Sequence, residues 1–186
     1  MARQVELPES IRDVTLDPSE RSEALERLLA EKQSDATVVV GLSEQLDAEL
    51  KRNDQRFVIY VLGAIRRIFD RRVVPHLISL LRRPVEITFR SQSIAGLSEL
   101  YKHSITREVL EAGSIARQNL PLEARVSAEN FRLQGDAPTA EDRAEIEEAL
   151  HSVADDEEEV EILRHQAREA YLRCTRLSLL VPRTEL

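Results

Sequence analysis

The 186-residue sequence contains one cysteine, no tryptophan and only five glycines. A single cysteine, Cys174, cannot form an intramolecular disulfide, so we expect a reducing compartment. The first residues lack the apolar core of a secretion signal, and no apolar run approaches the ~20 residues that span a bilayer. Together these absences predict a cytoplasmic protein that does not engage a membrane.

Recognisable motifs of catalysis and of metal or cofactor binding are also missing. The four histidines are scattered: His76, His103, His151 and His165. None belongs to an H-E-x-x-H motif or a Cys/His cluster, and there is neither a glycine-rich phosphate loop nor a G-x-S-x-G motif. Cys174 falls on an apolar helix face, which favours a buried structural thiol over a nucleophile. We therefore expect no catalytic residue, no metal and no cofactor.

What the sequence does contain favours helices. Leu, Glu, Arg and Ala are plentiful, apolar residues make up 42 % and charged residues 32 %, a soluble and helix-forming composition. The net charge of −8 is uneven. Residues 1–53 carry −5, residues 54–118 carry +5 and residues 119–186 carry −8. Any function has to account for a basic centre between acidic ends.

Apolar residues recur at helical spacing along most of the chain. We expect a loosely ordered arm over 1–16, a helical domain over 17–134, a linker over 135–138 and a helical hairpin over 139–181 that packs on the same domain. The expected helices lie at about 18–32, 36–50, 55–69, 74–83, 89–101, 105–112, 121–133, 140–153 and 160–181. The predicted caps are Asp17, Asp35, Asn53-Asp54 and a Thr139–Asp142 capping box.

Arg56, Arg90 and Arg125 each open an expected helix, at spacings of 34 and 35 residues. After the first of these helices, residues 73–81 read Val-Val-Pro-His-Leu-Ile-Ser-Leu-Leu. This order resembles the bacterial HEAT-like repeat, which also occurs in the bilin lyase family, and the resemblance covers about 54–112. Small residues would let the helices approach closely: Gly63, Ala64, Ala95 and Gly96. The resemblance implies a short HEAT-like α-solenoid of antiparallel helical hairpins with a long C-terminal capping helix.

Three Arg-Arg pairs crowd the basic centre: Arg66, Arg67, Arg71, Arg72, Arg82 and Arg83. In a helical hairpin, residues 66–72 and 82–83 lie at opposite ends. One interpretation is solvated helix ends that offset the helix dipole; the other is a surface for an acidic protein partner. Nucleic acid is disfavoured, because no aromatic platform accompanies the arginines and the net charge repels phosphate. The basic centre is also a potential partner for the chain's own acidic run, residues 155–159.

The last expected helix carries apolar residues at heptad spacing. They are Val160, Leu163, Ala167, Ala170, Cys174, Leu177 and Val181. This seam is explained by a capping helix packed along the domain, and self-association into a symmetric dimer is the alternative. The chain is then a monomer or a homodimer through this helix.

The expected function is a non-enzymatic module that binds another protein, as an adaptor or as an inhibitor or immunity-type binder. The six arginines are its candidate contacts. Two alternatives stay open: a bilin-lyase-like accessory that handles a chromophore or small ligand, and a homodimeric structural protein built on the helix over 160–181. The first depends on the family resemblance alone.

Overall fold

The computed structural model describes residues 7–32, 36–52, 55–111 and 136–179. Within these residues the chain forms eight α-helices, one 3-10 helix and no strand, which confirms the all-helical prediction. The elements are α1 (Glu9–Arg12), α2 (Pro18–Lys32), α3 (Ala36–Leu50), α4 (Arg56–Arg67), η1 (Arg71–Val73), α5 (Val74–Arg82), α6 (Ile87–Glu111), α9 (Ala140–Asp155) and α10 (Glu161–Ser178).

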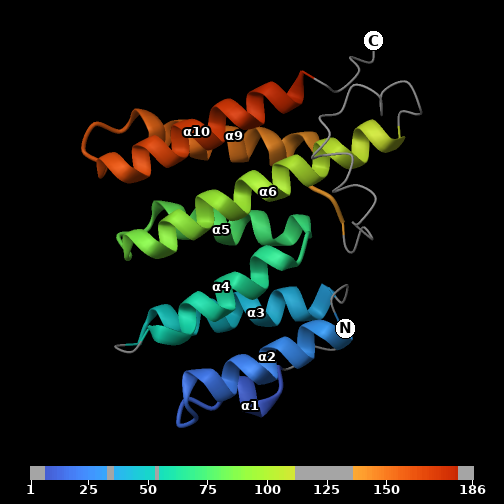
Figure 1. The fold of residues 1–186 in the computed structure, drawn as a ribbon, viewed down its shortest axis with the longest axis vertical. Helices are drawn as coiled ribbons and strands as arrows, with labels where there is room; N and C mark the ends of the chain where they lie inside the picture. The colour runs from blue at the N-terminus through green and yellow to red at the C-terminus, as the bar shows by residue number, and fades with distance from the viewer. Residues whose placement is uncertain (1–6, 33–35, 53–54, 112–135, 180–186) are drawn as a thin grey trace.

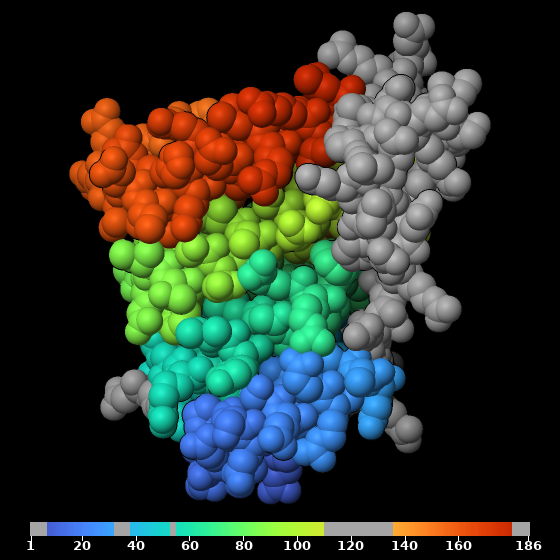
Figure 2. Space-filling view, in the orientation of Figure 1, coloured from blue at the N-terminus to red at the C-terminus, as the bar shows by residue number. Residues whose placement is uncertain are grey.

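The helices are stacked along the long axis of the molecule, with α1 and α2 at one end and α9 and α10 at the other (Figure 1). One row packs in the order α2, α4, α6, α10. The remaining helices pack on this row, α1 on α2, α3 on α4, α5 on α6 and α9 on α10, while α5 also contacts α9. Figure 2 shows the result as successive bands of chain from the N-terminal to the C-terminal end.

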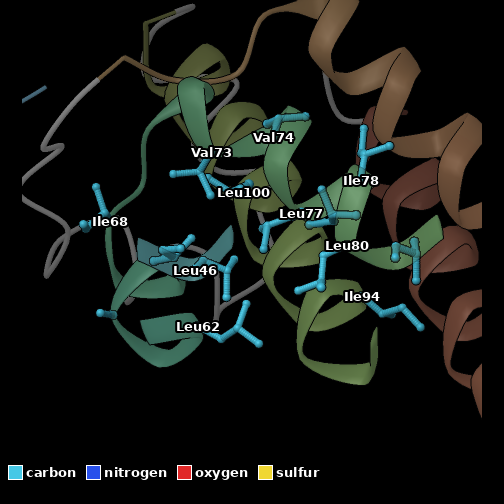
Figure 3. Packing of buried hydrophobic residues seen from close by; sticks show 14 of the residues in the cluster. Leu46, Leu62, Ile68, Val73, Val74, Leu77, Ile78, Leu80, Ile94 and Leu100 are labelled. Carbon is cyan, nitrogen blue, oxygen red and sulfur yellow. The ribbon is translucent and has the colours of Figure 1, made fainter. Parts of the chain in front are cut away.

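A single cluster of buried hydrophobic side chains runs through the stack, from Leu7 and Ile11 to Leu163 and Cys174. Its middle is drawn in Figure 3, where side chains of α3, α4, α5 and α6 meet around Leu77. The broad apolar face of α4 explains this position, since the helix has neighbours on three sides. Helices of this kind gain most of their stability from packing, not from intrinsic propensity.

Two expected elements differ in the structure. The helices predicted at 89–101 and 105–112 form one helix, α6, because nothing breaks the chain between them and the buried face continues through Ile105 and Val109. Within the segment predicted as a loose arm, residues 9–12 form α1, and Leu7 and Ile11 are buried. The helix expected over 121–133, with Arg125, lies outside the described residues.

Two of the predicted helix caps are confirmed. The Thr139–Asp142 capping box is present, with side chain and backbone bonded in both directions. Asp17 accepts hydrogen bonds from the backbone and hydroxyl of Ser19, as a helix cap does. The caps expected at Asp35 and Asn53-Asp54 lie outside the described residues, and Gln55 precedes α4 without a side-chain cap.

Two of the small residues predicted to allow close helix approach, Gly63 and Gly96, differ in the space around them. A methyl group on Gly96 would meet Leu77 Cδ1 at 2.9 Å and Arg66 Cγ at 3.0 Å, so this glycine does permit close packing of α6. A methyl group on Gly63 would have nothing within 4 Å. The prediction of a packing role is therefore wrong for Gly63, which faces open space on α4.

The two glycines form a matched pair for a stability test. Gly63→Ala is expected to raise the free energy of unfolding by about 0.5–1 kcal/mol, because alanine restricts the unfolded chain and favours helix. Gly96→Ala has the same helical gain but loses it to the crowding against Leu77, so its net effect is neutral or destabilising. Urea denaturation of both variants checks this, and equal stabilisation by both would contradict the packing of Gly96.

Candidate functional site

Five of the six predicted arginines contact other groups of the chain, and four of these contacts join neighbouring elements. Arg66 donates to Gln92 on α6, Arg67 to Glu26 on α2 at 2.6 Å, and Arg83 to Asp47 on α3 at 2.7 Å. Arg71 Nε lies 3.1 Å from Asp142 of α9, and Arg72 binds Asp70. Arg82 is exposed and makes no ion pair with a described residue.

These arginines do not share one surface cleft. Arg71 lines a cleft beside the start of α9, together with Arg107, Glu108 and Arg143. Arg82 and Arg83 line another, where α5 faces Glu145 and Glu148 of α9. Exposed ion pairs such as Arg67–Glu26 contribute at most about 1 kcal/mol. The six arginines therefore mostly connect adjacent helices, and they remain only weak candidates for partner contacts.

The acidic run meets the basic centre at one residue, Glu159. Both Nη atoms of Arg90 donate to its carboxylate, Nη1 at 2.9 Å, and Arg90 Nε donates to the carbonyl oxygen of Leu81 at 2.8 Å. Burial opposes ionisation of Glu159, but the hydrogen bonds from Arg90 and from the Val160 amide hold its pKa below its usual range. This paired carboxylate fixes the turn before α10 onto the start of α6.

The heptad seam of α10 packs within the chain. Leu163, Ala167, Ala170 and Cys174 are buried against α6 and α9, and Leu177 is partly buried. Val160 is exposed at the helix start, and Val181 lies outside the described residues. Four seam residues are thus not exposed to a second copy of the chain, as a capping helix requires.

Burial raises the pKa of Cys174 to about 12, with the nearby Glu147 carboxylate adding to the effect. The thiol therefore stays protonated and is not poised as a nucleophile. Within the described ranges no group of three or more His, Cys, Asp and Glu side chains is placed to hold a metal ion. None of the described helices is both long enough and apolar enough to cross a bilayer.

His103 is buried inside α6, where its ring stacks on Phe69 with the centroids 4.9 Å apart. Burial lowers its pKa to about 4, and the Arg107 charge acts in the same direction. The ring is thus neutral in the folded protein at neutral pH, which fits a structural position.

Acidification is expected to lower the free energy of unfolding through this histidine. Between its ordinary pKa of 6.5 and its folded value of about 4, the unfolded chain takes up a proton that the folded chain refuses. The free energy of unfolding should therefore be intact above pH 6.5 and fall by at most about 3 kcal/mol as the pH approaches 4. Urea denaturation at several pH values measures the slope.

His103→Phe is expected to remove most of that slope, because phenylalanine keeps the ring contact with Phe69 and does not titrate. His165→Phe, at an exposed position of α10, is the matched control and should keep it. A slope unchanged in His103→Phe would show that other groups dominate the acid response. One such group is Glu159, whose pKa is held below its ordinary value of 4.5.

A polar cleft of about 260 Å³ lies at the N-terminal end of the stack, and we call it the N-terminal cleft. It is formed by the segment before α2, the end of α3 and the start of α4. Its lining residues are Val14, Thr15, Leu16, Asp17, Pro18, Arg21, Glu49, Arg52, Arg56 and Phe57. Three guanidinium groups and two carboxylates thus surround a small volume.

A buried ion pair forms the floor of this cleft. Arg21 and Glu49 are 3 % and 1 % exposed, and an Nη atom of Arg21 donates to the Glu49 carboxylate. Arg21 Nε donates to the carbonyl oxygen of Ile11 at 2.9 Å, and its guanidinium lies 3.8 Å from the centre of the Phe57 ring. Gln45 donates to the same carboxylate oxygen at 2.7 Å. One arginine thereby ties α1, α2, α3 and α4 together.

Arg52 also lines the cleft, but not all of its hydrogen-bond donors are satisfied. Its Nη1 atom is buried and has no hydrogen-bond partner among the described residues, and a carboxylate oxygen of Glu49 is 4.0 Å away. That distance is too long for a hydrogen bond. A buried donor without a partner is uncommon in folded proteins and requires an explanation.

The outer face of α4 begins beside the cleft. Ile59 and Tyr60 are 47 % and 44 % exposed, although the other face of the same helix is fully buried. The rings of Tyr60 and Phe57 lie 6.1 Å apart, so an aromatic contact connects this face to the cleft. We call Ile59, Tyr60 and Gly63 the α4 face.

Sequence reasoning did not identify Arg21, Glu49 or Arg52. Apolar residues recur at helical spacing along α3 at Val39, Leu42, Leu46 and Leu50. In the structure Leu50 is only partly buried, while Glu49 is buried beside Leu46. The available signal was Gln45 and Glu49, two polar residues four apart next to this apolar stripe.

Comparison with known proteins identifies no relative. No protein-family model matches the chain, and no curated protein or solved structure is similar to it at a significant level. The HEAT-like resemblance over 54–112 therefore stays a prediction from the sequence.

Proposed function

We propose that this chain is a non-enzymatic, HEAT-like helical-repeat module that binds another protein, as an adaptor or an inhibitor, in the cytoplasm. Stacked rows of helices, each packed on its neighbours, support the repeat arrangement. Such folds act through extended surfaces built from successive helices. The proposal concerns the surface, because the fold alone implies no particular chemistry.

The observation that carries the proposal is the α4 face. Two large apolar side chains, Ile59 and Tyr60, are exposed side by side in the middle of the row α2, α4, α6, α10. Exposed apolar patches with polar surroundings mark interaction sites, and tyrosine is enriched at the energetic centres of interfaces. The same helix ends in polar contacts with its two neighbours, Arg67 with Glu26 of α2 and Arg66 with Gln92 of α6.

Affinity capture from the native host with the full chain tests this function. Ile59→Glu with Tyr60→Glu is expected to lose the dominant captured protein, because each carboxylate would have to be desolvated in the interface. The matched control is Ile162→Glu with Leu172→Glu, a second exposed apolar pair on α10, which should retain it. Loss in both variants, or in neither, would remove the α4 face as the interface.

A reversal of the arginine pairs to Glu is the complementary variant. We expect a weaker effect on capture than for the α4 face, because five of the six arginines already contact groups within the chain. A visible absorption band in the purified protein would instead favour the chromophore-handling alternative.

A further inference from the structure

We propose that a groove between α5 and α9 binds a segment of a partner protein in which an apolar residue lies between a basic and an acidic one. We call it the α5–α9 groove, and its volume is about 630 Å³. Its lining residues are Pro75, Ile78, Ser79, Arg82, Arg83, Glu145 and Glu148. The inference goes beyond the proposed function, because this groove shares no residue with the α4 face.

The two walls of the groove carry opposite charges that do not neutralise each other. Arg82 lies on α5, and Glu145 and Glu148 lie on α9. All three side chains are exposed, and none of them forms an ion pair with another described residue. Glu145 and Glu148 are three residues apart, so they are neighbours on one face of α9. A segment that carries both charges would pair with both walls at once.

The second arginine of the lining already has a partner within the chain. Arg83 Nη1 lies 2.7 Å from Oδ1 of Asp47 on α3. The groove therefore has one unpaired cation, Arg82, and two unpaired carboxylates. A wholly basic segment would be opposed by Arg82, and a wholly acidic one by the two glutamates. This arrangement favours a segment of mixed charge whose basic residue lies against α9.

The apolar part of the lining favours a peptide segment over a free ion. Pro75, Ile78 and Arg82 recur at helical spacing on one face of α5, with Ser79 beside them. Ile78 is buried and Pro75 is exposed. An apolar side chain of the segment would contact both residues while its charged neighbours reach the walls. The volume of the groove is within the range of sites that hold a ligand of several groups.

A titration followed by NMR tests the groove with three defined peptides. They are acetyl-Lys-Leu-Glu-amide, acetyl-Lys-Leu-Gln-amide and acetyl-Gln-Leu-Glu-amide, added to the full chain at about 0.15 M salt, which screens the long-range attraction of the net charge. We expect saturable shifts of the Ile78 methyl and Arg82 Nε–Hε signals with the first peptide. Binding should be up to about fivefold weaker for each of the others, the effect of one exposed ion pair.

Variants of each wall assign the two charges separately. Glu145→Gln with Glu148→Gln should abolish the preference for Lys over Gln and keep the preference for Glu over Gln. Arg82→Gln should do the reverse. These side chains are exposed, so the variants are expected to fold. The matched control is Glu44→Gln, at an exposed glutamate of α3 outside the groove, which should keep both preferences.

No saturable shift, equal binding of the three peptides, or preferences that survive in both groove variants would each overturn the inference. Binding of the Lys-Leu-Gln peptide as tight as that of the Lys-Leu-Glu peptide would overturn it too, because Arg82 would then recognise nothing. Failure here is distinguishable from failure of the proposed function. The variant Ile59→Glu with Tyr60→Glu should lose the captured protein and still bind the Lys-Leu-Glu peptide.

Discussion

Replacing Glu49 with leucine is expected to lower the free energy of unfolding by about 3–5 kcal/mol. The substitution leaves the Arg21 guanidinium buried, 3 % exposed, without its counter-charge. It also removes the acceptor of the Gln45 amide. The Arg21 guanidinium is also held in place by its hydrogen bond to the carbonyl oxygen of Ile11 and by its contact with the Phe57 ring. Urea denaturation followed by circular dichroism measures the change.

The matched control for this prediction is Glu44→Leu, an exposed glutamate on the same helix, which should change stability by less than about 0.5 kcal/mol. The double variant Arg21→Met with Glu49→Leu should recover much of the loss, since a buried ion pair is often replaceable by apolar groups of similar volume. A loss below about 1 kcal/mol in Glu49→Leu would show that Arg21 reaches solvent in the absence of its partner.

Much of the helical organisation was predictable because short-range sequence patterns determine it. A capping box acts over three residues, and the Thr139–Asp142 box was visible for that reason. Apolar spacing likewise records which face of a helix is buried, as it does for Ile146, Ala149 and Leu150 on α9. The break predicted inside α6 arose where this rule fails. His103 and Ser104 are polar but buried, and their burial depends on Phe69 and on the carbonyl of Pro138, contacts that spacing does not record.

The N-terminal cleft was not predictable for a related reason. Arg21 and Glu49 are 28 residues apart, and nothing local marks them as partners among 34 acidic and 26 basic side chains. The six arginines were predicted as candidate contacts because they occur as adjacent pairs in the sequence. In the structure, the two members of a pair contact different helices, since Arg66 contacts α6 and Arg67 contacts α2. Doublets of like charge thus mark helix ends here more than a common surface.

Matched core truncations at the two ends of the stack, Leu25→Ala on α2 and Leu163→Ala on α10, are each expected to lower stability by about 2–5 kcal/mol. Both side chains are at most 1 % exposed. In a helical-repeat stack each helix is stabilised mainly by its neighbours, so the loss should be concentrated near the altered end. Amide hydrogen exchange of the full chain measures this for every described helix.

Leu163→Ala should therefore reduce protection in α9, α10 and the adjoining part of α6 while leaving α2 and α3 nearly unchanged, and Leu25→Ala should do the reverse. The reason is connectivity, because α2 packs on α4 and α10 packs on α6 and α9, so intervening helices separate the two ends. If both variants lower protection equally in all helices, the continuous core acts as one cooperative unit. The repeat arrangement would then have no energetic meaning, and the interaction surface would have to be treated as the face of an ordinary single-core helical domain.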